Sequence, residues 1–158
     1  PLRLVGSEMC IRDRRAVNKV YTALLCGHVE QDEGTVDAPI AKDPALFPLM
    51  TICARTGKPA RSRYRVVERI YQDTTMPLTR VELTPETGRT HQLRVHLAAI
   101  GHPLTGDWLY GTEDRALIAR PALHSYHLRM MHPLTGTTID VTAPLPEDIQ
   151  RLLKEERL

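Results

Sequence analysis

The chain reads ETGRTHQLRVHLAAIGHP from residue 86 to residue 103, and this stretch decides how its fold is interpreted. Before it, apolar and polar residues alternate over residues 79–84, which predicts a half-buried strand that ends in a turn. A helix is then predicted over residues 90–100, with Thr90 as its N-cap and Gly101 as its stop signal. Its apolar stripe would consist of Leu93, Leu97 and Ile100.

Two side chains of the predicted helix, His91 and Arg94, would lie one turn apart near its positive N-terminal end. A histidine in a helix is usually structural, and we assign that role to His96. Arg94 differs because it lies between Leu93 and Val95, where a guanidinium is costly unless a carboxylate or phosphate pairs with it. We therefore expect an anionic partner for Arg94, supplied by the chain or by a substrate.

Four strings along the chain resemble motifs of one protein family. In order they are KVYTA (19–23), GRTHQLRVHL (88–97), GHPLTGD (101–107) and ALHS (122–125). They are similar to the second motif, the third motif and a closing strand of the RluA-type pseudouridine synthases. The likeness extends over residues 15–148, and it implies an α+β pseudouridine synthase fold: a mixed, mainly antiparallel sheet with flanking helices, incomplete at its N-terminus.

The resemblance implies an enzyme that isomerises uridine to pseudouridine in ribosomal RNA, transfer RNA or both, with no cofactor. The reaction breaks the bond between uracil N1 and the ribose and rejoins the base through C5, on a uridine flipped out of the RNA. Arg94 would pair with a catalytic aspartate, and Tyr21 would stack on the base. His91, Gln92 and Leu123 would form the pocket. Tyr21 also fits a core strand, and whether the carboxylate attacks the ribose or removes a proton stays open.

The family's first motif, His-Arg-Leu-Asp-x-x-Thr-Ser-Gly, carries the catalytic aspartate and has no counterpart in this sequence. Only Asp13 precedes Tyr21, and its neighbours do not match the motif. Residues 5–14 look like translated sequencing-adaptor read-through. We therefore predict a foreign segment at 1–14, followed by the C-terminal part of a single catalytic domain at 15–158 that is inactive as it stands. The alternative is a non-catalytic RNA-binding module.

The net charge is only +2, but residues 55–69 contain six basic residues and one acidic residue. Arg61, Arg63 and Arg65 alternate with other residues, so a strand would place them on one face, about 6 to 7 Å apart. We predict that they contact the RNA backbone, as does Arg89. An edge strand protected by charge is the alternative. The acidic residues 30–43 are predicted to form a solvated loop turned away from the RNA.

The composition is that of one globular domain, with 158 residues of which 42% are hydrophobic. No apolar run is long enough for a membrane span. Cys10, Cys26 and Cys53 are far apart, which favours free thiols in a reducing compartment, and we expect a cytoplasmic location. His91 and His96 would point to different helix faces, so no metal site is predicted. The expected protein is a monomer that binds RNA.

Overall fold

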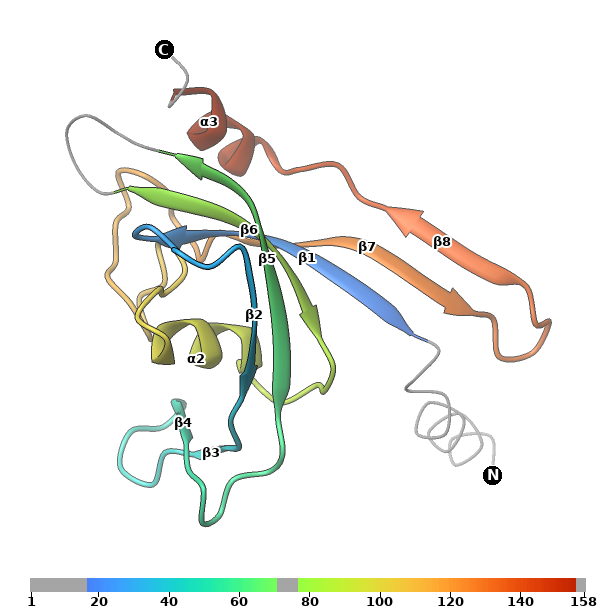
Figure 1. The fold of residues 1–158 in the computed structure, drawn as a ribbon, viewed down its shortest axis with the longest axis horizontal. Coiled ribbons are helices and arrows are strands. Elements are labelled where there is room, and N and C mark those ends of the chain that lie inside the picture. The colour runs from blue at the N-terminus through green and yellow to red at the C-terminus, as the bar shows by residue number, and fades with distance from the viewer. Residues whose placement is uncertain (1–16, 71–76, 156–158) are drawn as a thin grey trace.

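The computed structural model describes residues 17–70 and 77–155, and Figure 1 shows the arrangement of the elements. In chain order these are β1 (Asn18–Cys26), β2 (Glu33–Asp37), β3 (Ile40–Lys42), β4 (Met50–Ile52), β5 (Arg61–Ile70), β6 (Leu78–Pro85), α2 (Gln92–Ala99), β7 (Leu123–Met131), β8 (Thr138–Thr142) and α3 (Glu147–Glu155). Six strands form one sheet in the order β2-β5-β6-β1-β7-β8, and β3 pairs with β4. Each of these pairings is antiparallel, although the resemblance allowed for a mixed sheet.

The sheet has two covered faces, which we call the α2 face and the α3 face. On the α2 face, Ala23 of β1 and Leu83 of β6 are fully buried in a core cluster that contains Leu97 of α2. On the α3 face, Leu24 of β1 is fully buried in a second cluster with Ile149 of α3. Successive residues of β1 thus point to opposite faces and are buried on both, as in the interior of a sheet.

Strand β5 carries Arg61, Arg63 and Arg65, which we call the arginine row, and its position in the sheet differs from the alternative considered above. The three arginines are all exposed and share one face of the strand, as predicted. However, β5 lies between β2 and β6, so the edge-strand alternative is wrong. The predicted loop at 30–43 is also wrong in part, because β2 and β3 lie within it and β2 covers the outer edge of β5.

Helix α2 is shorter than predicted and begins differently. It spans Gln92–Ala99, and its N-cap is His91, not Thr90. His91 has a φ of 53°, in the left-handed region that non-glycine residues seldom adopt. The predicted stop is confirmed by Gly101, which has a φ of 85°. Ile100 is exposed, so it does not extend the buried stripe of the helix as predicted.

The remaining elements lie at the C-terminal end of the described chain. Strands β7 and β8 form an antiparallel hairpin, and α3 buries Ile149 and Leu152 in the core cluster of the α3 face. Cys26 and Cys53 are free thiols, as predicted. The predicted foreign segment at 1–14, including Cys10, lies outside the described residues. Among the residues described, no helix is long and apolar enough to cross a membrane, and no cluster of histidine, cysteine and acidic side chains suits a metal ion.

Candidate active site

Arg94 has the anionic partner that its position in the sequence requires, and that partner is Asp107. Its Nε donates a hydrogen bond to Asp107 Oδ2 at 2.8 Å, and its Nη2 donates to Oδ1 at 2.7 Å. The Arg94 side chain is only 14% exposed and that of Asp107 is fully buried. A two-point contact of this kind fixes the plane of the guanidinium as well as its position.

Asp107 is also held by the backbone of its own loop. Its Oδ1 accepts hydrogen bonds from the N–H groups of Leu109 and Tyr110, at 3.0 and 3.1 Å. Burial alone would raise the pKa of Asp107, but Arg94 and these two N–H groups outweigh burial and hold the pKa below its ordinary value. The carboxylate is therefore ionised at neutral pH, and it raises the pKa of Arg94.

Two aromatic rings lie against the same guanidinium. The Cζ atom of Arg94 lies 5.2 Å from the centroid of the Tyr110 ring and 5.5 Å from that of Trp108. Both distances are in the range of a cation–π interaction. Trp108 is the only tryptophan of the chain, and half of it is exposed to solvent. The site therefore has a fixed positive charge beside an exposed aromatic surface.

Tyr110 connects this site to His91 and to the small β3–β4 sheet. Its hydroxyl accepts a hydrogen bond from the N–H of Met50 at 2.9 Å and lies 2.8 Å from His91 Nδ1. The Tyr110 hydroxyl can then donate its proton to His91 Nδ1. In a neutral imidazole the single N–H group is in that case at Nε2. Burial and, next, the charge of Arg94 lower the pKa of His91, so the imidazole is neutral near pH 7.

Gln92 and His96 belong to a buried hydrogen-bond chain between α2 and β5. Gln92 Nε2 donates to Ser62 Oγ at 2.9 Å, and Ser62 Oγ lies 2.9 Å from His96 Nδ1. His96 Nε2 donates in turn to the carbonyl of Ala38 at 2.8 Å, which confirms its structural role. Gln92 Oε1 accepts from Thr87 Oγ1 and from the N–H of Arg89. All the polar atoms of Gln92 are thus used within the protein, and its role in the substrate pocket stays a prediction.

The other predicted site residues occupy different places. Tyr21 and Leu123 are half-buried and pack against the core cluster of the α2 face, the cluster that contains Leu93. The arginine row points to the opposite, α3 face, where Arg61 and Arg63 both pair with Glu86. Arg65 pairs with Glu82, and Arg89 donates to the carbonyl of Pro59. Contact of these four arginines with RNA stays a prediction, and the arginine row is on the other side of the sheet from Arg94.

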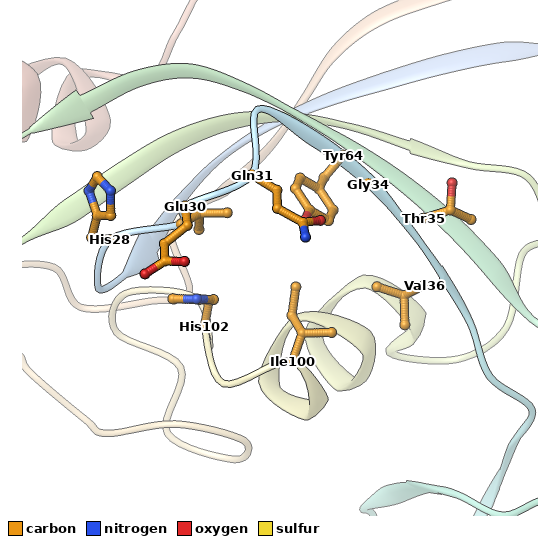
Figure 2. A pocket seen from close by; sticks show the side chains of 10 residues that line it. His28, Glu30, Gln31, Gly34, Thr35, Val36, Tyr64, Ile100 and His102 are labelled. Carbon is orange, nitrogen blue, oxygen red and sulfur yellow. The ribbon is translucent and has the colours of Figure 1, made fainter.

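A pocket of about 560 Å³ lies elsewhere on the α2 face, between the segment before β2 and the end of α2. Figure 2 shows Tyr64 of β5 beside Gly34, with Glu30 and His102 at one side and Ile100 below. None of the residues predicted for the site lines this pocket. This pocket is therefore separate from the site around Arg94.

Comparison with known proteins identifies the family. A sequence profile described as RNA pseudouridylate synthase matches residues 7–99. The chain belongs to the RNA pseudouridylate synthase family. Relatives include the ribosomal large subunit pseudouridine synthase D of Nitrosomonas europaea, 41% identical over 91% of this chain and 42% of its own length. The dual-specificity RNA pseudouridine synthase RluA of Pasteurella multocida is 43% identical over 82% of this chain and 58% of its own. This family member thus spans about half the length of these relatives.

Solved structures agree with the pseudouridine synthase fold. Human RNA pseudouridylate synthase domain containing 1 superposes with a TM-score of 0.74 at 30% identity, covering 97% of this chain and 70% of that chain. The human domain-containing 4 protein, at 23% identity and a TM-score of 0.71, shows the same fold. The family assignment and the α+β fold expected from the sequence motifs are therefore confirmed.

Three residues of the Arg94 site were not predicted as functional: Asp107, Trp108 and Tyr110. Asp107 is part of the strings that carry the resemblance, but only Arg94 was singled out as a charge that needs a partner. The available signal was a carboxylate 13 positions after Arg94, just beyond the helix stop. Trp108, the single tryptophan in the sequence, was a second signal.

Proposed function

We propose that this chain holds the target uridine in an RNA pseudouridine synthase, which isomerises uridine to pseudouridine in ribosomal RNA, transfer RNA or both. One observation carries the proposal. Arg94 is fixed by Asp107 through Nε and Nη2, whereas its Nη1 makes no hydrogen bond within the described part of the chain. A second carboxylate can therefore bind at Nη1 without breaking the pair with Asp107.

The first-motif aspartate of the family is the carboxylate that we place there. A guanidinium beside it stabilises its ionised form, which either attack on the ribose or proton removal requires. Because Asp107 and two rings already restrict the Arg94 side chain, little further ordering is needed when that carboxylate binds. No step of this chemistry calls for a metal or a cofactor.

Tyr21 and Leu123 support the binding half of the proposal. Both lie on the α2 face, on neighbouring strands β1 and β7, and neither is fully buried. A flipped base gains about 1 to 3 kcal/mol from stacking on an aromatic ring, which offsets part of the cost of unstacking. The substrates would be folded RNAs in the cytoplasm, and the protein would act as a monomer.

The test is release of tritium from RNA labelled at uridine C5. We expect none from the chain as printed, and turnover after a relative's first-motif segment is joined to its N-terminus. In that joined protein Arg94→Ala should remove most of the activity, whereas Arg115→Ala should not, because Arg115 pairs with Glu113 in an exposed loop. Normal turnover of the Arg94→Ala protein would contradict the proposal. RNA binding without turnover in the joined protein would favour the non-catalytic module.

A further inference from the structure

The loop between α2 and β7 carries the aspartate that pairs with Arg94, and both ends of this loop are fixed to one residue of β1. The carbonyl of Leu24 accepts a hydrogen bond from the N–H of Thr105 at 2.9 Å, and the N–H of Leu24 donates to the carbonyl of Ala122 at 3.0 Å. The two loop ends also bond to each other, since the N–H of Ala122 donates to the carbonyl of Thr105 at 2.9 Å. We call residues 105–122 the site loop.

Inside the site loop, the backbone of Arg120 lies against the residue that precedes Asp107. That residue is Gly106, which has a φ of 76°, in the left-handed region that favours glycine. A Cβ atom at Gly106 would lie 2.6 Å from the carbonyl oxygen of Arg120 and 2.6 Å from the side chain of Ile118, so no larger residue fits there. The position of Asp107 therefore depends on the position of Arg120.

The guanidinium of Arg120 connects helix α3 to the beginning of β7. Its Nε donates to Asp148 Oδ2 at 2.8 Å, and its Nη2 donates to Asp148 Oδ1 at 2.9 Å. Its Nη1 donates to the carbonyl of Leu123 at 3.0 Å and to that of Pro121 at 3.2 Å. The planar fork of an arginine can make these bonds at once, whereas the single ammonium of a lysine cannot reproduce them.

Helix α3 is a fixed anchor for this guanidinium. Asp148 is in the first turn of α3, where the helix dipole favours a negative charge. Ile149, the next residue, is fully buried in the core cluster of the α3 face, and that cluster also contains Ile118 of the site loop. The contacts of Arg120 thus connect a helix on the α3 face to the loop that orients Arg94 on the α2 face.

We infer that Arg120 is a positioning residue for the proposed reaction, because it fixes the site loop from α3. This inference rests on the proposed function and assigns a further residue to it. Arg120 would act through Asp107, which sets the plane of the Arg94 guanidinium, and through Leu123, whose carbonyl it holds and which we predict for the base pocket. A displacement of about 1 Å in such groups can slow a reaction about a hundredfold.

The first measurement uses the chain as printed and does not depend on turnover. Solvent exchange of the Arg94 Nε–H, followed by NMR, reports how often its bond to Asp107 opens. Arg120→Gln is the test variant and Arg115→Gln the matched control, since Arg115 is in the same loop, is 81% exposed and pairs with Glu113. We expect exchange to become about tenfold faster or more in Arg120→Gln and to stay within about twofold in the control. Thermal unfolding checks that both variants fold.

The second measurement is tritium release by the joined protein. We expect Arg120→Gln to lower kcat about tenfold to a hundredfold and to leave KM for the RNA within about twofold, because Arg120 positions other groups and does not bind the substrate. Arg120→Lys should recover only part of the loss. Asp148→Asn removes the charge that anchors Arg120 and keeps the size of the side chain, so it serves as the second test variant and should act in the same direction if Arg120→Gln does not fold.

Unchanged exchange of the Arg94 Nε–H in Arg120→Gln, or an effect equal to that of Arg115→Gln, would overturn the inference. So would a normal kcat of the Arg120→Gln variant of an active joined protein. A rise in KM without a fall in kcat would also overturn it, because Arg120 would then belong to the RNA-binding surface. Absence of tritium release from the unmutated joined protein would count against the proposed function, and the exchange measurement alone would then decide the inference.

Discussion

Replacing Arg94 by methionine is the sharpest test of the site, because it removes the charge and keeps a long side chain. Asp107 would lose both guanidinium bonds and keep only the N–H groups of Leu109 and Tyr110 on Oδ1. Its Oδ2 would be left without a partner in the described structure. A buried carboxylate in that state is destabilised, and its pKa rises.

The size of the effect follows from burial. Hydrogen bonds to charged groups contribute roughly 1.5 to 3 kcal/mol each, and two are lost. Breaking a buried ion pair from one side costs about 3 to 5 kcal/mol, whereas an exposed pair contributes about 0 to 1 kcal/mol. Asp107 is fully buried and Arg94 is only 14% exposed, so the value for a buried pair applies. We expect Arg94→Met to lower the free energy of unfolding by about 3 to 5 kcal/mol at pH 7.

The assay is urea unfolding of the wild type, Arg94→Met, Asp107→Asn and the double variant, which together form a double-mutant cycle. The double variant should be more stable than Arg94→Met alone, because no buried charge remains unpaired. The destabilisation by Arg94→Met should also shrink as the pH falls toward 4, where the unpaired Asp107 is protonated and the cost of its charge is removed. A loss below about 1 kcal/mol at pH 7, or no coupling in the cycle, would refute the reasoning.

Further expectations concern the surroundings of the site. Tyr110→Phe keeps the ring beside Arg94 but leaves the Met50 N–H unpaired, so it should cost about 1 to 3 kcal/mol and speed hydrogen exchange at Met50. Burial lowers the pKa of His96, so unfolding takes up a proton below about pH 6.5 and the free energy of unfolding of the wild type falls as the pH is lowered there. His96→Gln should reduce this dependence of the unfolding free energy on pH, as measured by urea unfolding at several pH values. Replacing Arg61, Arg63 and Arg65 together by alanine should flatten the salt dependence of RNA binding; an unchanged slope would limit them to their pairs with Glu82 and Glu86.

The sequence predicted those features that depend on neighbouring residues in the chain. The strands with clear alternation, the glycine stop after α2 and the need of Arg94 for an anion were all correct. The N-cap was not, since the Gln92 side chain turns back to bond with Thr87 and with the N–H of Arg89. Thr90 is left exposed by this arrangement. A side chain that competes with the cap in this way leaves no periodic signal in the sequence.

The interior position of β5 was missed for a related reason. Its outer neighbour β2 has the sequence EGTVD, in which two acids and a glycine give little strand propensity. Gly34 is nevertheless suited to the strand, because a Cβ atom there would lie 2.5 Å from the hydroxyl oxygen of Tyr64 on β5. Close packing of an aromatic ring on a glycine is a tertiary requirement that propensity does not contain.

The charges of the Arg94 site explain why its two carboxylates would not be equivalent. Asp107 is fully buried, bonded to both the guanidinium and its own loop, and its depressed pKa makes it a poor proton acceptor. A second carboxylate at Nη1 would contact one guanidinium nitrogen where Asp107 contacts two, so its pKa would be lowered less and it would remain the more reactive group. Asp107 therefore orients Arg94, and in the proposed enzyme Arg94 would in turn orient the reacting carboxylate. On this argument Asp107→Asn in the joined enzyme should reduce turnover through Arg94, and the pH at which activity appears should rise as Arg94 loses its fixed position.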